Sequence, residues 1–581
     1  MTLREDRFEL RTGKARRETR QRPASFVKQI LRAAHRSGRS VSRCRTGKPG
    51  GVSFGRGSAA TLATRDTAFA RRVVIKTHIV RHTSASGNSL GRHINYLERD
   101  GVARGGEDAR MFDHAGDKVP AKDFAERCAD DRHHFRFMVS PEDAVQLQDL
   151  RALTRELMSD MERDLGTKLD WQAVDHWNTD NPHVHILVRG IDDTGQDLVI
   201  SRGYISHGMR ARAEERVSLE LGPRSEREIA ADIKKQITAE RWTKLDQALT
   251  RRVSMGDGIA DLRPGRSHQD QNFQNALRGR AQHLEKMKLA RQLDPARWSF
   301  VPDMEDRLRE LGTRGDIIKT MHNAMARSGR RADVSRFSLT EVSGKSVVGK
   351  FVARGLHDEL RGEAFAIVDG VDGRSHYLRF GNVEVTGDAA PGAIVELRNW
   401  KDGQGRRART LAVRSDFDLT SQVTADGATW IDRQLVAKSQ DDLGGGFGKE
   451  VASAMERRVE FLTEQGLAKK QGGRVVFARN LIVTLRKREI EKIASKIERE
   501  TRIAHRPTKQ GEYLSGTYSK RLQLASGRFA MVESISEGGK SFELVPWRPA
   551  LEKQLGKPVQ GQMMPGGRVD WSVGRQRGLS R

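Results

Sequence analysis

Two short apolar segments that carry three histidines constrain the fold of this chain most strongly. Residues 171–176 (WQAVDH) and 183–189 (HVHILVR) have the length and β-branched content of strands, and a six-residue loop separates them. Alternation along a strand places His183 and His185 on one face, and Val184, Ile186 and Val188 on the other face, in a core. The short loop can bring His176 back opposite His183. The sequence therefore predicts an antiparallel sheet with three imidazoles on one face.

Further strands and helices surround this pair. Residues 90–99 have apolar side chains at helical spacing, with Gly101 as a C-cap, and a second helix is predicted over 142–165. Strands are predicted at 72–80, 134–139 and 197–200. This order indicates an α/β (α+β) fold in which helices flank a central antiparallel sheet.

The rest of the chain divides by composition into several units, and no clean internal repeat is evident. We predict a basic, largely disordered tail at 1–70, with one helix near 24–36, and the α/β domain at 71–250. The remaining predicted units are a helical linker region at 251–338, a small β-barrel at 339–416, a winged-helix-like unit at 417–505 and a small β-rich unit at 506–581.

The charge indicates what kind of partner to expect. The 581 residues carry a net charge of +27, and residues 1–72 hold 19 Lys or Arg against 5 Asp or Glu. Cations placed on phosphates release counterions, so this balance favours a nucleic-acid partner over a merely solvated tail. Two cysteines exclude a disulfide framework and a cysteine zinc site, and indicate a reducing compartment. No apolar run is long enough to predict membrane insertion, and no secretory signal is recognisable.

The three histidines have the spacing of a metal site. Imidazoles from adjacent strands can supply half of an octahedral shell, or three ligands of a tetrahedral one, with a position left open for a substrate oxygen. The alternative is a set of ordinary strand histidines, which a lone His-x-His usually is; the third histidine favours a metal. Among nearby carboxylates, alternation points Asp175 away from His176.

A tyrosine on the helix 90–99 is the candidate nucleophile. Tyr96 is one of five tyrosines in the chain and lies beside the apolar stripe of that helix, with Arg92, His93 and Arg99 around it. A phenol has a pKa near 10, so it is a weak nucleophile at neutral pH unless cations or a metal-bound phosphate assist it. Taken alone, such a residue is more often a packing residue.

These signals together resemble a known family, the relaxases, which are mobilisation endonucleases of conjugative and mobilisable elements. The resemblance rests on Tyr96 within 91–101 (GRHINYLERDG), followed by His176 and 182–185 (PHVH). Rolling-circle replication initiators are similar, but they place the tyrosine after the histidines. The branch that the chain resembles is the one that includes the T-DNA border endonucleases, and 136–143 (RFMVSPED) resembles its middle motif. The resemblance covers roughly 72–250; the remainder resembles an uncharacterised region often fused to relaxases.

The resemblance implies a function and a set of site residues. Tyr96 would nick DNA by transesterification, giving a 5′-phosphotyrosine, while His176, His183 and His185 would hold a divalent ion, Mg²⁺ or Mn²⁺. Many members have His-x-Asp at the first histidine, whereas this chain has His176-Trp177-Asn178. The candidates for hydrogen-bonding to the histidine ligands, and so orienting them, are Asp175, Asn178 and Glu142. The candidate DNA-binding residues are Arg72, Lys76, Arg81 and Arg92.

The implied partner is single-stranded or locally melted DNA at an origin of transfer, with relaxosome accessory proteins and a type IV secretion coupling protein. The implied location is the bacterial cytoplasm, with passage into a recipient cell alongside the DNA. Two other functions remain open: a rolling-circle initiator or hydrolytic metal nuclease, and a non-catalytic DNA-binding protein with a structural metal. Tyr204 with His207 is a further candidate nucleophile pair.

Overall fold

A computed structural model describes residues 56–58 and 69–572, apart from 83–88, 101–102, 108, 178–180, 257, 264–267, 331, 340–345, 402–404, 406, 438–441, 473, 537–538 and 566. Most of the predicted tail, including its helix near 24–36, lies outside these residues. The chain divides into two compact units, Met1–Pro302 and Asp303–Arg581, which are described separately below. Within the described residues, no helix is both long and apolar enough to cross a membrane.

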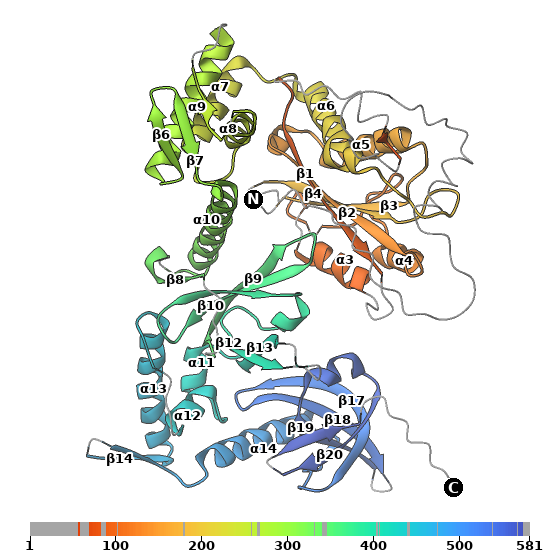
Figure 1. Ribbon diagram of the computed structural model, residues 1–581. Helices are drawn as coiled ribbons and strands as arrows, with labels where there is room; N and C mark the ends of the chain where they lie inside the picture. The colour runs from red at the N-terminus through yellow and green to blue at the C-terminus, as the bar shows by residue number, and fades with distance from the viewer. Residues whose placement is uncertain are drawn as a thin grey trace. The chain divides into compact units, whose positions relative to one another are not determined.

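A four-stranded antiparallel sheet forms the centre of the first unit (Figure 1). Its strands are β1 (Val73–Arg81), β2 (His133–Pro141), β3 (Trp171–His176) and β4 (His183–Arg189), in the order β1-β2-β4-β3. The prediction of a central antiparallel sheet is confirmed. The predicted strand at 197–200 was wrong, because Asp197 and Ile200 form only isolated bridges, to Ile191 and to Arg56 respectively.

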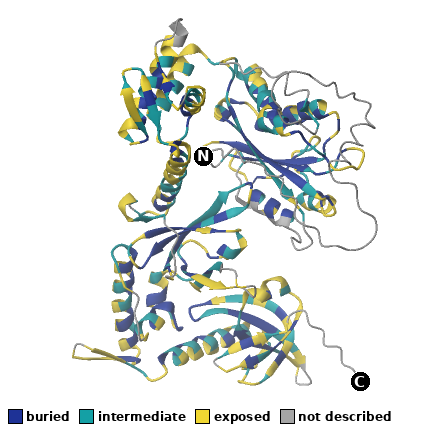
Figure 2. Cartoon of the chain, viewed as in Figure 1, coloured by how far each residue is buried: buried dark blue, intermediate teal, exposed yellow. Residues whose placement is uncertain are grey.

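Helices cover both faces of this sheet (Figure 1), and β2, β3 and β4 are largely buried (Figure 2). Helices α5 (Leu150–Leu165) and α6 (Met209–Leu221) pack on one face, over a core that includes Val184, Ile186 and Val188. The other face is covered by α3 (Ser89–Asp100) and α4 (Ala121–Arg127). There the predicted apolar stripe Leu90, Ile94 and Leu97 packs on Val174 and Leu187.

Helix α5 begins later than predicted. The segment after β2 first makes a short 3₁₀ turn, Ala144–Gln146, and the α-helix starts only at Leu150. The side chain of Asp149 accepts a hydrogen bond from the backbone N–H of Arg151 and so caps the helix. The buried Leu147 continued the helical spacing in the sequence, although it belongs to the turn.

The first unit continues with α7 (Glu226–Ile237), α8 (Lys244–Met255) and α9 (His268–Lys286). Between and after them lie three short strands, β5 (Ala260–Asp261), β6 (Ala290–Asp294) and β7 (Arg297–Phe300), in a sheet of order β5-β7-β6. The sequence indicated helices here, but strands of two to five residues are too short to show an alternating pattern.

The second unit contains two six-stranded sheets. After α10 (Met304–Arg327), the first sheet has the order β13-β12-β9-β10-β11-β8, with β13 and β8 as separate edges. The predicted β-barrel is therefore wrong: the sheet stays open, because β8 is only two residues long and bonds only to β11. The strands are β8 (Phe337–Ser338), β9 (Val348–Asp358), β10 (Glu363–Gly370), β11 (Ser375–Phe380), β12 (Ile394–Lys401) and β13 (Arg407–Ser415).

Helices and a hairpin separate the two sheets. They are α11 (Leu419–Val423), α12 (Trp430–Leu435), α13 (Phe447–Glu464), the hairpin β14 (Ala468–Gln471) and β15 (Arg474–Phe477), and the long helix α14 (Leu481–Thr501). The last sheet has the order β16-β19-β18-β17-β20-β21. Its strands are β16 (Ala504–His505), β17 (Tyr513–Leu524), β18 (Gly527–Ser536), β19 (Gly539–Pro546), β20 (Pro558–Met564) and β21 (Arg568–Trp571).

One segment of each unit is built around a fully buried arginine–aspartate pair. In the first unit, Thr243 caps α8 in a capping box with Asp246. Arg280 of α9 donates to both carboxylate oxygens of Asp246, at 2.8 and 2.9 Å. Its other N–H groups donate to the backbone carbonyls of Ile237, Ala239 and Arg241.

The second unit repeats this arrangement. Thr429 caps α12 in a capping box with Asp432, and Arg458 of α13 donates to both oxygens of Asp432, each at 2.8 Å. The remaining N–H groups of Arg458 donate to the carbonyls of Val423, Ala425 and Gly427. Residues 237–246 (ITAERWTKLD) and 423–432 (VTADGATWID) align without a gap.

The similarity extends beyond the buried pair. In both cases the helix that carries the arginine is followed along the chain by a β-hairpin and then by a long helix, which is α10 of the second unit in the first case and α14 in the second. Lys288 and Gly466, each two residues past that helix, both have a left-handed backbone, with φ of 60° and 70°. The chain therefore contains an internal repeat, and the expectation of none was wrong. The copies share few residues, and the arginine follows the aspartate by 34 residues in one and 26 in the other.

Candidate metal and DNA site

Three histidines converge on one face of the first sheet. His176 at the end of β3 lies directly opposite His183 at the start of β4, as predicted, and His185 follows two residues later on the same face. The three side chains are 6, 4 and 2% exposed, and each offers a ring nitrogen within 4.8 Å of the others. The ring centroids are separated by 4.9 to 5.4 Å. No acidic or cysteine side chain joins this cluster among the described residues.

Backbone carbonyls orient two of these rings. His183 donates from Nδ1 to the carbonyl oxygen of Asn181, at 2.9 Å, which turns Nε2 toward Nε2 of His185, 3.2 Å away. His176 donates from Nε2 to the carbonyl oxygen of Leu97, at 3.0 Å, which leaves Nδ1 as the ring nitrogen that could bind a metal. Neutral imidazoles held by carbonyls are the usual form of histidine ligands. The triad therefore fits a divalent ion by the chemistry of its donors.

The hydrogen bond to Leu97 joins the helix α3 to the triad. Leu97 is the residue after Tyr96, so the backbone of the candidate nucleophile lies beside His176. The apolar stripe of α3 holds this position by packing on Val174 and Leu187. The side chains of Tyr96 and Arg92 lie outside what the structure describes.

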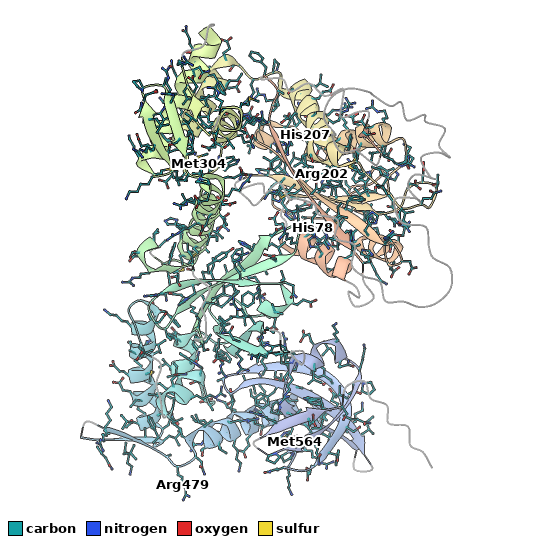
Figure 3. The ribbon with its side chains drawn as sticks, in the orientation of Figure 1. His78, Arg202, His207, Met304, Arg479 and Met564 are labelled. Atoms are coloured by element: carbon teal, nitrogen blue, oxygen red, sulfur yellow. The ribbon has the colours of Figure 1, made fainter. Side chains whose placement is uncertain are left out.

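Basic side chains continue across the same face of the sheet, away from the triad. Residues directly opposite each other on neighbouring strands share a face, and the register aligns Lys76 with Met138 and His185. The next row aligns His78, labelled in Figure 3, with Arg136 and Leu187. The face that carries the triad is therefore cationic along β1 and β2.

Arg136 and His134 lie deep in this basic region. Arg136 donates from Nε to Nε2 of His134, at 3.0 Å, and Nδ1 of His134 in turn lies 2.6 Å from Nε2 of His82. Burial lowers the pKa of Arg136 to about 10. Burial, followed by the charge of Arg136, lowers the pKa of His134 to about 2, so this imidazole is neutral at physiological pH. Arg136 was recognised from the sequence only as part of a motif and was not predicted as a site residue.

The predicted DNA-binding cations lie in different settings. Lys76 is half-buried on the triad face. Arg81 is exposed at the end of β1, where it lies opposite His133. Arg72 is half-buried and forms an ion pair with Asp232, so it is engaged within the protein.

The carboxylates predicted to orient the triad lie elsewhere. Asp175 lies on the opposite face of β3, where it accepts hydrogen bonds from Arg151 and from the indole of Trp177, both at 2.8 Å. These three residues line a pocket of about 330 Å³ beside the loop that joins the histidine strands. Glu142 is exposed just after β2, and Asn178 lies outside the described residues. Carbonyl oxygens take the orienting role that was expected of carboxylates.

The second candidate nucleophile, Tyr204, is a packing residue. It is fully buried in the core on the other face of the sheet, and its hydroxyl donates to Asp164, at 3.0 Å. Burial and the neighbouring Asp164 raise its pKa. Asp164 is held by Arg212 through two hydrogen bonds, each 2.9 Å long. His207 is exposed and makes no described contact with Tyr204.

Two family models match the chain. Residues 116–217 match the family described as "Relaxase: MobA/VirD2-like, nuclease domain", a range that contains the triad but begins after Tyr96. Residues 277–412 and 401–580 match the family described as "Protein of unknown function (DUF3363)", which together is more than half of the chain. No curated protein and no solved structure matches. The chain therefore belongs to the DUF3363 family and carries, ahead of that region, the nuclease domain of a MobA/VirD2-like relaxase, which at the level of that family nicks DNA in mobilisation.

Proposed function

We propose that this protein nicks and rejoins one DNA strand by tyrosine transesterification at the transfer origin of a mobile element. The observation that carries the proposal is the buried triad of His176, His183 and His185, with ring nitrogens within 4.8 Å of one another, inside the range that matches a relaxase nuclease domain. The contact between His176 and Leu97 supports the choice of Tyr96, because it brings that helix to the triad.

The chain's own groups have distinct roles in this reaction. The three histidines would hold a divalent ion, which when bound supplies positive charge to the non-bridging oxygens of one DNA phosphate. Tyr96 attacks the phosphorus through its phenol oxygen; the bond from phosphorus to the 3′-oxygen breaks, and the DNA keeps a free 3′-hydroxyl. The phenol proton leaves, and the 3′-oxygen takes up a proton. Because a phosphodiester is exchanged for a phosphodiester, the reverse attack reseals the strand.

The basic face beside the triad would hold the substrate strand. Lys76 and Arg136 lie on neighbouring rows of the triad face, on β1 and β2, so a phosphate backbone that approaches along this face meets positive charge before it reaches the histidines. The side chain of Arg136 is 5% exposed, and its Nε is bound to the neutral ring of His134, which leaves its positive charge undiminished. We propose that the buried charge of Arg136 adds to the positive potential of this face, and that the half-buried Lys76 contacts the phosphate backbone of the strand.

The test is covalent capture of DNA by the full chain. Single-stranded oligonucleotides that tile a candidate transfer origin are incubated with Mn²⁺, and protein–DNA adducts are resolved on denaturing gels. We expect the wild type and Tyr204→Phe to form an adduct, and Tyr96→Phe and His183→Ala to form none. Tyr204 is the matched control, because it is a tyrosine of the same unit that hydrogen-bonds to Asp164 in the core.

Mass spectrometry of the adduct then decides between the functions. An oligonucleotide attached to Tyr96 supports transesterification. Cleavage without an adduct, retained in Tyr96→Phe, would establish a hydrolytic metal nuclease. DNA binding with no cleavage in Mg²⁺ or Mn²⁺, across all tiled sequences, would leave a non-catalytic DNA-binding protein with a structural metal.

A further inference from the structure

The β14–β15 hairpin is a basic element of the second unit that the nicking reaction does not use. Between Gly466 and Asn480 the chain carries four cations, Lys469, Lys470, Arg474 and Arg479, and no acidic residue. All four are exposed. Figure 3 labels Arg479, whose side chain extends away from the ribbon at the end of this hairpin.

The register assigns the two faces of the hairpin. Ala468 pairs with Phe477 at the end of the hairpin that joins the helices, and both side chains belong to the core there. The face that carries this pair is therefore the inner face of the hairpin. The alternate pairs, Lys469 with Val476 and Gln471 with Arg474, share the outer face. Lys469 and Arg474 are diagonal neighbours on this face, about 7–8 Å apart. The outer face thus combines two cations with an amide and an exposed aliphatic side chain.

Few of these cations are neutralised inside the protein. Among the contacts that the structure describes, the acidic group nearest to the hairpin's cations is Glu460, 4.0 Å from Lys470. The corresponding hairpin of the first repeat, β6–β7, has Arg291 and Arg297 at the equivalent positions, but there Arg297 pairs with Asp294 at 2.5 Å. The two repeats therefore share a scaffold and differ in the charge that their hairpins leave for a partner.

We propose that the outer face of β14–β15, formed by Lys469, Gln471, Arg474 and Val476, together with Arg479, binds duplex DNA. A two-stranded ribbon has the width that the major groove admits, and from there Lys469 and Arg474 can each contact a phosphate while the amide of Gln471 reaches a base edge. No aromatic side chain is exposed on the described part of the hairpin, whereas surfaces for single strands depend on aromatic stacking. This second DNA site is independent of the nicking reaction and would hold the protein on the duplex beside the strand that it processes.

The test measures duplex binding by the full chain in EDTA, where no metal-dependent cleavage occurs. The probe is a fluorescein-labelled 24-base-pair duplex of arbitrary sequence, and anisotropy is followed from 50 to 300 mM NaCl. We expect Lys469→Ala/Arg474→Ala to reduce the slope of log K against log salt by about 2, because each of the two removed cations would neutralise one phosphate. The matched control, Lys492→Ala/Lys496→Ala, removes the same charge from α14, where both lysines pair with acidic groups, and we expect it to leave the slope nearly unchanged.

A second readout separates this hairpin from the rest of the basic chain. Acetylation footprinting should show Lys469 protected by the duplex and Lys492 unprotected. Equal slopes for the hairpin variant and the control, or an unprotected Lys469, would overturn the proposal, as would equal losses of affinity for a single strand of the same length. A failed nicking assay would not affect this result, because cleavage plays no part in it.

Discussion

The buried arginine of each repeat allows a quantitative test, which we develop for Arg458→Lys. All five N–H donors of Arg458 are used: two bind Asp432, and three bind the carbonyls of Val423, Ala425 and Gly427. Both charged side chains are 0% exposed. Lysine keeps the charge but has only three donors on a single nitrogen, so it cannot reproduce the fork of a guanidinium.

The expected loss follows from the acceptors that lysine cannot reach. At least two of the five hydrogen bonds are lost, and each buried acceptor left without a partner costs about 1–3 kcal/mol. The local stability of this segment should therefore fall by about 2–6 kcal/mol, which is a loss of about 30-fold or more in amide protection. Asp432 still accepts hydrogen bonds from the N–H and the hydroxyl of Thr429, so only its interactions with residue 458 are weakened.

Hydrogen exchange measured by mass spectrometry is the appropriate assay, because a chain of several units does not unfold in one step. Arg458→Lys should deprotect α13 and leave α9 unchanged. Arg280→Lys should do the reverse, because its five hydrogen bonds follow the same pattern. A loss in α13 of less than about 5-fold, roughly 1 kcal/mol, would refute the reasoning. Equal effects of both variants on both helices would refute the independence of the two repeats.

Three further predictions concern the first unit. Because the triad offers only imidazole nitrogens, Mn²⁺ should bind at least about 10-fold more tightly than Mg²⁺ in calorimetry, and His183→Ala should abolish binding; equal affinities would contradict the assigned donors. The pKa of His134 is about 2 in the folded protein and about 6.5 in the unfolded chain, so the folded state is favoured most above pH 6.5 and loses stability as the pH falls toward 2. The free energy of unfolding should fall by about 2 kcal/mol between pH 7 and pH 5. Hydrogen-exchange protection of β2 in His134→Asn should depend less on pH than in the wild type. Gly190→Ala would place a Cβ 1.9 Å from the carbonyl oxygen of His133 and should destabilise the sheet by about 1–3 kcal/mol in thermal unfolding, while Gly105→Ala, which meets no atom within 4 Å, should be neutral.

The sequence predicted the histidine hairpin well because two independent patterns agreed there. Strand alternation set which residues face the core, and the loop length set the register between His176 and His183. Both are local properties, and they depend little on the rest of the chain. The helix with Leu90, Ile94 and Leu97 was predictable for the same reason.

Contacts between distant segments were not predictable from these patterns. The tautomer of His176 depends on the carbonyl of Leu97, 79 residues away, and a backbone carbonyl leaves no trace in residue type. Tyr204 was considered as a nucleophile because the sequence does not show that Asp164 lies beneath it. Closure of a barrel depends on whether edge strands meet, which the alternation in 339–416 does not determine. The repeat was missed because its defining contact joins residues 34 apart in one copy and 26 apart in the other.

The way the triad is held has a consequence for how the protein would respond to loss of the divalent ion that we propose it binds. The rings are fixed by strand alternation, by the core beneath β4 and by two carbonyl oxygens, which are all contacts within the protein itself. We therefore expect the domain to fold before it binds an ion, in contrast to small zinc-dependent domains, which fold only when loaded. Chelation of the ion should abolish nicking activity without unfolding the domain, and adding the ion back should restore the activity. The ion would then act as a replaceable reagent, and its concentration in the cell as a reversible control on when DNA is cut.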